Sequence, residues 1–295
     1  MSADPIGELI AEERLPESYR EVVSEFWQPL ANRIGREAAT RKPLIVGING
    51  AQGSGKSTVC RFLESLLRPR GLRTVTLALD DLYLTRDERS ALAREVHPLF
   101  ATRGVPGTHA IGLGFDIVED VLTSRPFTLP RFDKAADDRA PTGTHVTGPV
   151  DVLLIEGWCV GARPQDEAEL AMPVNALEEL EDPNMLWRYV VNRHLGADYA
   201  KLFGLIDLLV MLKVENFEAV HANRSLQEAK LRAAQPDAPG LMDDDALTRF
   251  IAHYERLTRH MLDEMPGRAD VTFEIGADQV PTRLPDGLKA TGPIS

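Results

Sequence analysis

One short stretch of this chain restricts its fold more than any other: Gly50 to Ser57 reads GAQGSGKS and matches the pattern GxxxxGK[ST]. The apolar run LIVGIN at 44–49 precedes it, and the amphipathic run TVCRFLESLLR follows it and ends before Gly71. A glycine-rich turn between a buried strand and a helix lets backbone N–H groups surround a polyphosphate, because side chains would block that approach. The stretch therefore predicts a phosphate-binding loop.

Each part of this loop has an expected task. Lys56 supplies a positive charge to the β- and γ-phosphates of a nucleotide, and the Ser57 hydroxyl coordinates Mg²⁺. The helix that starts here adds the positive end of its dipole. The chain contains no NKxD pattern, which would indicate a guanine base, so we expect ATP with Mg²⁺. The residues expected to contact the nucleotide are Gly50, Gly53, Ser54, Gly55, Lys56, Ser57 and Thr58.

The surrounding pattern predicts an α/β fold. RTVTLAL at 73–79 is a second strand, so strand, glycine loop, helix and strand follow one another closely. Such a βαβ unit implies a parallel sheet with a right-handed crossover. Further strands are expected at 151–157, 205–214 and 271–275, with a helical region at 185–203. We predict a three-layer P-loop NTPase fold, in which helices flank a mostly parallel central sheet.

The pattern also divides the chain. Residues 1–42 contain an amphipathic helix expected to pack on the main body, residues 43–280 form the main nucleotide-binding domain, and residues 281–295 form a tail with several Pro and Gly. Between residues 85 and 149 the periodicity weakens and Pro and Gly breaks multiply. We therefore expect a loop-rich connection there, and long connections inside a compact domain are usually functional.

Composition argues against several classes of function. The 45 Asp and Glu outnumber the 33 Lys and Arg, and the resulting net charge of −12 repels a phosphodiester backbone. No run approaches the ~18 apolar residues that span a bilayer, and the start has no signal-peptide pattern. Cys60 and Cys159 lie in apolar stretches without CxxC spacing, so we expect free core thiols. These features predict a soluble, cytoplasmic protein that binds neither nucleic acid nor a membrane, and they leave its oligomeric state open.

Carboxylates follow two predicted strands, at the edge where parallel sheets bind ligands. Asp80 follows the second strand and can accept the proton of an attacking hydroxyl, as a base does in phosphoryl transfer. Asp81 is an alternative base, or a cap for the next segment. Glu156 closes the strand at 151–157, and we expect it to orient the metal or its water, the alternative being a cap for the following loop. Asp151 begins that strand and should lie at the opposite end of the sheet.

Five segments resemble, in chain order, the D-glycerate 3-kinases of plant and fungal type: GINGAQGSGKST, LALDDLYLT, RGVPGTH, RFDKAADDR and LLIEGWCVG, within residues 43–275. That family stands with uridine kinase, phosphoribulokinase and bacterial pantothenate kinase among the P-loop kinases. The resemblance implies ATP-dependent phosphorylation of a primary alcohol, D-glycerate to 3-phosphoglycerate, with Asp80 as base. A pantothenate or nucleoside kinase remains an alternative and so does, from another class, a regulatory ATPase without a metabolite substrate.

The resemblance also implies a helical lid over ATP. The family's basic lid helix is similar to NRSLQEAKLR in this chain, which offers Arg224, Gln227, Lys230 and Arg232. Basic residues three and four apart share a helix face and can meet phosphates together. A solvated helix shows similar charges, so the residues themselves leave both interpretations open.

A pocket for a small hydroxy acid is expected beside the nucleotide. Arginine suits a carboxylate because its planar fork donates two parallel hydrogen bonds. His109, taken alone, is more often a structural residue. The chain departs from the family pattern at Ala110, where relatives carry Asp, and at Phe132, where they carry Tyr, and either change bears on which acid is accepted. The residues expected around the acceptor are Asp81, Tyr83, Arg103, Thr108, His109, Asp133, Lys134 and Arg139.

Overall fold

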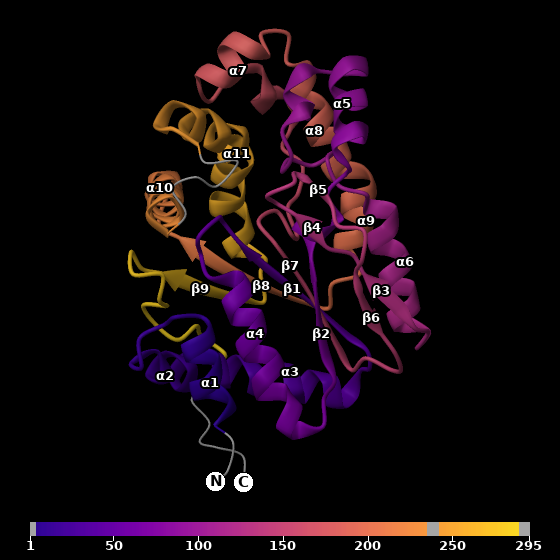
Figure 1. Cartoon of the computed structure of the whole chain (residues 1–295), viewed down its shortest axis with the longest axis vertical. Helices are drawn as coiled ribbons and strands as arrows, with labels where there is room; N and C mark the ends of the chain where they lie inside the picture. The colour runs from indigo at the N-terminus through magenta and orange to yellow at the C-terminus, as the bar shows by residue number, and fades with distance from the viewer. Residues whose placement is uncertain (1–3, 235–241, 289–295) are drawn as a thin grey trace.

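A five-stranded sheet, parallel throughout, forms the centre of the molecule, with strand order β2-β7-β1-β8-β9 (Figure 1). The structure, a computed structural model, describes residues 4–234 and 242–288, without the side chains of 227–231, 233 and 234. The strands are β1 (Leu44–Gly50), β2 (Thr74–Ala78), β7 (Val152–Gly157), β8 (Leu208–Val214) and β9 (Val271–Ile275). The predicted α/β fold is confirmed.

Helices cover both faces of this sheet, which explains why its three inner strands, β7, β1 and β8, are apolar at most positions. In β7, Val152 and Leu154 join the hydrophobic core on one face, whereas Leu153 and Ile155 join the core on the other. The first core is completed mainly by α1 (Pro5–Glu12), α2 (Tyr19–Val22), α3 (Gln28–Thr40), α4 (Lys56–Leu67) and α10 (Phe217–Ala234). The second core is completed mainly by α6 (Ile111–Leu122), α9 (Ala200–Phe203) and the C-terminal half of α11 (Asp244–Glu264).

The expectation of a loop-rich connection between residues 85 and 149 is wrong. The stretch contains α6, described above, and α5 (Arg86–Glu95), which begins with a capping box between Thr85 and Glu88. It also contains two short antiparallel pairs. The Pro and Gly breaks mark the turns between these short elements. The paired strands are β3 (Phe127–Leu129) with β6 (Thr144–Val146), and β4 (Phe132–Asp133) with β5 (Asp138–Arg139).

The N-terminal helices pack into the same core as the phosphate-loop helix. Leu9 and Trp27 belong to the hydrophobic cluster that contains Phe62 of α4, and Tyr19 stacks on Phe62 with ring centroids 5.5 Å apart. A five-residue π-helical turn, Val23–Trp27, joins α2 to α3. Of the predicted tail, residues 289–295 lie outside the described residues, and Leu288 is buried in this cluster.

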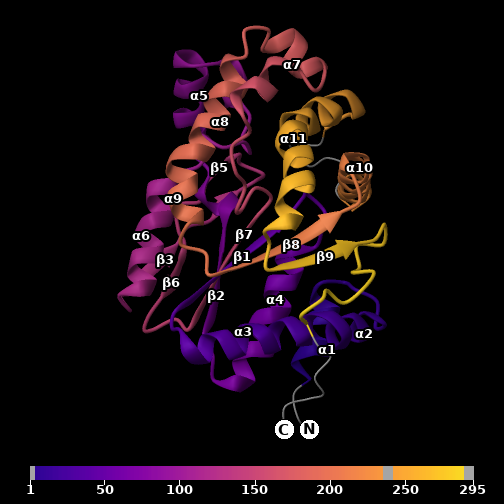
Figure 2. The same cartoon turned by 180° about the vertical axis from the view of Figure 1, so that it is seen from behind.

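A smaller cluster caps the end of the molecule away from the chain termini, where Figure 2 shows α5, α7 and α8 together from behind. It contains Phe100, Leu177 of α7 (Ala176–Glu181) and Trp187 of α8 (Leu186–His194). In the described part of the chain, every helix is too short or too polar to cross a membrane. Cys60 and Cys159 are free and buried, as expected.

Candidate active site

The phosphate-binding loop joins the end of β1 to the start of α4. Gly53 and Gly55 have φ angles of 76° and 83°, a left-handed conformation that residues with side chains rarely adopt. A Cβ atom at Gly50 would lie 2.3 Å from Ser54 Oγ, so the loop closes tightly only over glycine. Ser54 Oγ itself is buried without a hydrogen-bond partner in the described structure. The loop thus has the shape and the spare polar group of a cradle for an anion.

Ser57 and Glu156 meet at the carboxyl end of the parallel strands. The Ser57 hydroxyl donates to Glu156 Oε1 at 2.8 Å, while Glu156 Oε2 is buried and finds no partner among the described residues. Burial raises the pKa of Glu156, against the opposing charge of Lys56. A hydroxyl beside an unpartnered carboxylate oxygen fits a hard divalent cation, which prefers oxygen ligands and fills its remaining positions with phosphate and water. The described residues contain no group of three or more His, Cys, Asp or Glu side chains that could hold a metal ion by themselves.

Asp80 lies in the one-turn helix Leu79–Leu82, directly after β2. Its Oδ1 accepts a hydrogen bond from the Tyr83 hydroxyl at 2.8 Å, and its Oδ2 pairs with Lys134 Nζ at 2.7 Å. Burial raises the pKa of Asp80, but Lys134 and Lys56 outweigh burial and lower that pKa to about 2. Asp80 is therefore an oriented anion at neutral pH.

Asp81 is turned away from this position. Its Oδ2 accepts from Arg131 Nη1 and its Oδ1 accepts from the backbone N–H of Phe132, both at 3.0 Å. Both oxygens thus anchor the segment that leads into the β4–β5 hairpin. Of the two neighbouring aspartates, the geometry favours Asp80 as a reactive group and Asp81 as an anchor.

The phosphate loop and Asp80 line one cleft with a volume of about 350 Å³. The charged groups in its described lining are four cations and a single carboxylate, so the cleft is suited to anions. Arg224 reaches it from α10 and lies 5.9 Å from the ring centroid of Phe250 on α11. The lining residues are Gln52, Gly53, Gly55, Lys56, Ser57, Thr58, Asp80, Tyr83, Arg103, Lys134, Trp158, Arg224, Phe250 and Tyr254.

Of the residues expected around the acceptor, Tyr83, Arg103 and Lys134 line the cleft. The side chains of the other five hold parts of the fold together, and their positions do not support a contact with the acceptor. These residues are Asp81, Thr108, His109, Asp133 and Arg139. Thr108 is fully buried and bonds to Gly104 and Val105 of its own loop.

Asp133 and Arg139 hold the β4–β5 hairpin in the same way. Asp133 Oδ1 caps the turn that follows it, accepting from the N–H groups of Ala135 and Ala136. Arg139 donates to the carbonyl oxygen of Tyr83 at 3.1 Å. The hairpin that carries Lys134 is thereby fixed against the segment that carries Asp80.

His109 supports the site from behind. Its side chain is buried, its ring stacks on Tyr83 with centroids 4.6 Å apart, and its Nδ1 lies 2.5 Å from the Tyr199 hydroxyl. Burial lowers the pKa of His109 to about 3, so the imidazole is neutral. The stack fixes the tyrosine that donates to Asp80.

The two departures from the family pattern have structural positions. Ala110 precedes α6 as its N-cap residue, and no side chain caps that helix. Two guanidinium groups lie over the Phe132 ring, that of Arg103 at 5.5 Å and that of Arg89 at 5.7 Å from the ring centroid. Arg103 and Arg89 also pair with Asp137, which holds Arg103 at the border of the cleft.

Sequence reasoning missed an aromatic pair in the cleft wall. Trp158 Nε1 donates to the carbonyl of Gly104 at 2.8 Å, and the Tyr254 hydroxyl donates to the carbonyl of Arg103 at 3.0 Å. Trp158 directly follows the strand that ends at Gly157 and was recognisable locally. Phe250 and Tyr254 belong to an ordinary amphipathic helix, so no local signal marks them. Gln52 also lines the cleft unpredicted, and the side chains of Gln227 and Lys230 lie outside the described residues.

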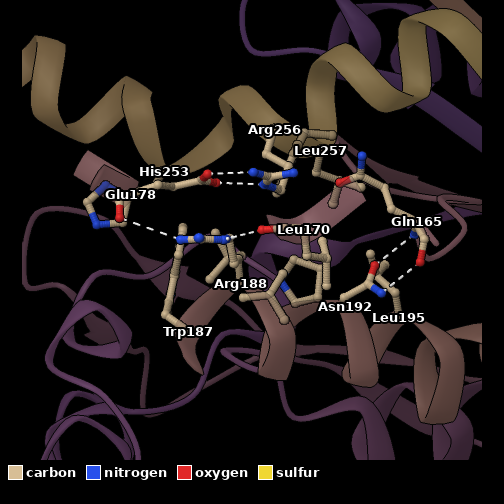
Figure 3. A pocket seen from close by; sticks show the side chains of 14 residues that line it. Gln165, Leu170, Glu178, Trp187, Arg188, Asn192, Leu195, His253, Arg256 and Leu257 are labelled. Atoms are coloured by element: carbon tan, nitrogen blue, oxygen red, sulfur yellow. Dashed lines mark hydrogen bonds and ion pairs between the residues drawn. The ribbon is translucent and has the colours of Figure 1, made fainter. Parts of the chain in front are cut away.

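A second cavity, of about 20 Å³, lies between α7 and α8 on one side and α11 on the other (Figure 3). Glu178 accepts two hydrogen bonds from Arg256, at 2.8 and 2.6 Å, and Arg188 donates to the carbonyl of Leu170 at 2.7 Å. The space holds about one water molecule. Its charged groups largely satisfy one another, so this cluster ties α7, α8 and α11 together and offers no ligand site.

Comparison with known proteins identifies the family, although no protein-family model matches the chain. The uncharacterized kinase mug58 of Schizosaccharomyces pombe is 31% identical over 225 residues, which cover 72% of this chain and 79% of that protein. The chain belongs to this family of P-loop kinases. This chain is also 30% identical over 244 residues to the chloroplastic D-glycerate 3-kinase of Arabidopsis thaliana. The match covers 77% of this chain and 50% of that protein.

A solved structure agrees with the sequence relatives. D-glycerate 3-kinase from Cryptococcus neoformans is 25% identical to this kinase and superposes with a TM-score of 0.73, covering 87% of this chain and 97% of that one. A uridine kinase of Limosilactobacillus reuteri matches over 54% of the chain at 25% identity. The resemblance inferred from five short segments is confirmed, and kinases of this fold use ATP as the phosphate donor.

Proposed function

We propose that this kinase transfers the γ-phosphate of ATP to a hydroxyl group of a small hydroxy acid, with D-glycerate as acceptor and 3-phosphoglycerate as product. The charge of the cleft carries this proposal. Lys56 lies in the phosphate loop and Arg224 on α10, which leaves Arg103 and Lys134 on the side of Asp80. An acceptor with its own carboxylate matches these two cations, whereas a neutral nucleoside brings no negative charge for them to bind.

The names of the similar proteins support the same acceptor. The Arabidopsis and Cryptococcus proteins are both called D-glycerate 3-kinase. The chain spans half the length of the Arabidopsis protein but nearly all of the Cryptococcus chain. The support is therefore strongest for the part of the kinase that contains the cleft.

In the proposed reaction Asp80 is the base. It accepts the proton of the acceptor hydroxyl while that oxygen forms a bond to the γ-phosphorus in line with the departing ADP oxygen, whose bond to phosphorus breaks. Tyr83 and Lys134 hold the two oxygens of Asp80, which sets its orientation before the acceptor arrives. Lys56 stabilises the charge that spreads over the transferred group.

An acidic acceptor also improves the base. Among the neighbouring groups that lower the pKa of Asp80, Lys134 has the largest effect. An acceptor carboxylate that draws the Lys134 ammonium toward itself weakens this effect, so Asp80 becomes more basic when the acceptor is bound. Lys134 is 63% exposed and has the freedom to make this exchange.

Ser57 and Glu156 are the residues proposed to hold Mg²⁺. The orphaned Glu156 Oε2 and the adjacent Ser57 hydroxyl supply two oxygen ligands of the kind that this ion prefers. When bound, the ion neutralises charge on the phosphates of ATP.

The test is coupled ADP release with ATP and Mg²⁺ in the presence of D-glycerate, L-glycerate, pantothenate, uridine or ribulose 5-phosphate. We expect strong stimulation by D-glycerate, and phosphorus NMR of the product should then show a phosphate ester on its terminal hydroxyl. Stimulation by another acceptor instead would retain the kinase and reject this acid. Equal ADP release with and without every acceptor would favour an ATPase without a metabolite substrate.

A further inference from the structure

A contact between the N-terminal segment and the phosphate loop lies outside the site described so far. Thr58, in the first turn of α4, lines the cleft, and its hydroxyl donates to Glu13 Oε2 at 2.7 Å. Glu13 follows the last residue of α1, and its side chain is only 19% exposed. A residue of the proposed ATP site is thus bonded to a carboxylate from a helix that precedes the first strand.

Arg61 fixes Glu13 in this position. Its guanidinium pairs with both Glu12 and Glu13, and it lies three residues after Thr58, on the same face of α4. The helix that carries these carboxylates is anchored because Leu9 and Ile10 are buried in the core. Glu13 is therefore held against α4 by contacts that do not depend on Thr58.

The bond determines what Thr58 offers to a ligand. A threonine hydroxyl has a single proton, and here that proton is directed to Glu13. The oxygen then presents only lone pairs to the cleft, and these repel phosphate oxygens. The carboxylate also places a negative charge beside the N-terminus of α4, where the helix dipole would otherwise favour an anion. Both effects oppose the binding of a polyphosphate.

We propose that Glu13 is a positioning residue that weakens ATP binding by holding the Thr58 hydroxyl, so that the N-terminal helix sets the nucleotide affinity of the kinase. The inference rests on the proposed ATP site. ATP turns the Thr58 proton toward a phosphate oxygen and leaves Glu13 paired with Arg61 alone. Because coupling between two sites is reciprocal, bound ATP loosens the contact of the N-terminal helix by the same factor.

The test is the dissociation constant of ATP with Mg²⁺, measured by calorimetry on the full chain. Glu13→Gln removes the negative charge and leaves a weaker hydrogen-bond acceptor for the Thr58 hydroxyl. We expect the dissociation constant of ATP to fall about threefold to tenfold. Glu12→Gln is the matched control, because Glu12 pairs with Arg61 but makes no bond to Thr58. This control should change the constant by less than about twofold. In a Thr58→Val background, Glu13→Gln should lose the part of its effect that acts through the hydroxyl, so the constant should fall less than in the unaltered chain.

A second measurement uses the unaltered protein. Hydrogen exchange of the backbone amides at the end of α1 should become faster when ATP binds, because the Glu13 contact is then weaker. An unchanged or higher dissociation constant for Glu13→Gln overturns the inference, and so does an equal effect of Glu12→Gln or exchange that slows with ATP. If the unaltered kinase binds no ATP, the proposed function fails first, so the two failures are distinguishable.

Discussion

The two sides of the cleft are built in different ways. The phosphate side is one continuous segment, residues 50–58, whose shape comes from glycines and the start of one helix. The acceptor side combines Asp80 and Tyr83 after β2, Arg103 from a loop, Lys134 from a hairpin and Tyr254 from α11. Backbone conformation alone forms the first, whereas the second exists only when distant elements are packed. Damage to the phosphate side should therefore weaken nucleotide binding, while damage to the acceptor side should spare it.

The largest expected effect comes from Lys56→Ala. Loss of this ammonium removes charge stabilisation from both the bound polyphosphate and the transition state, so we expect kcat/KM to fall on the order of 10⁴-fold, with weaker ATP binding. Steady-state kinetics and calorimetry measure the two effects. Lys42→Ala is the control, because Lys42 pairs with Asp151 at the other end of the sheet. Normal ATP affinity in Lys56→Ala would contradict the assignment of the phosphate side.

Asp80→Asn tests the acceptor side without altering the phosphate side. An amide cannot take the hydroxyl proton, so we expect kcat to fall by about 10³-fold while the ATP dissociation constant changes little. Asp81→Asn is the matched control. Both oxygens of Asp81 anchor the hairpin segment, so that variant should lose stability more than turnover. If the control loses turnover and Asp80→Asn keeps it, Asp81 is the base.

Lys134→Gln separates recognition of the acceptor from recognition of ATP. We expect kcat/KM for the acidic acceptor to fall about 10- to 100-fold, because a charge-assisted partner of its carboxylate is lost, while KM for ATP stays nearly constant. Lys201→Gln removes another well-exposed lysine, which pairs with Asp198, and should have no effect. A rise in KM for ATP alone would move Lys134 to the phosphate side.

His109 makes the acceptor side sensitive to acid. Burial lowers the pKa of His109 to about 3, whereas an unfolded chain has a histidine pKa of about 6.5. Below pH about 6.5 the unfolded chain binds a proton at His109 that the folded chain does not. The contribution of the neutral, buried His109 to the free energy of unfolding is therefore complete above pH about 6.5 and is lost progressively as the pH falls toward 3. Between pH 7 and pH 5 we expect a loss of about 2 kcal/mol in the free energy of unfolding.

Denaturant unfolding of His109→Asn at both pH values measures this contribution. The variant should be less stable than the unaltered kinase at pH 7 but should lose about 2 kcal/mol less on acidification. His145→Asn changes an exposed histidine on β6 and should keep the full pH dependence. Identical pH dependence for His109→Asn and the unaltered kinase would show that His109 does not titrate as its burial requires.

The smallest expected effect is that of Ala110→Asp. An aspartate here would cap α6, which has no side-chain cap, and should raise the free energy of unfolding by about 1 kcal/mol. Thermal unfolding measures the gain. Acceptor preference should stay the same, because the departure from the family pattern is then one of helix capping. A change of preferred acid would instead place position 110 on the acceptor side.

Much of the fold was predictable because its signals are local. The runs that became β1, β7 and β9 were placed within a residue or two, and the continuous hydrophobicity of the run that became β1 indicated burial on both faces. The stretch between residues 85 and 149 was misjudged because α5, α6 and the short strand pairs interrupt one another before any period is established. Short elements held by tertiary contacts leave a weak pattern in the sequence.

The sequence alone determined the phosphate side, because a turn of glycines followed by lysine and a hydroxyl binds phosphate through its own backbone. Tertiary structure decided the acceptor side. Asp80 and Asp81 are neighbours of the same residue type, and their different partners separate them, above all Lys134 for Asp80 and Arg131 for Asp81. The same holds for Glu13, whose proposed effect on ATP binding depends on its contact with the Thr58 hydroxyl of α4. Side chains that act through partners distant in the chain acquire their roles only when packing brings those partners together.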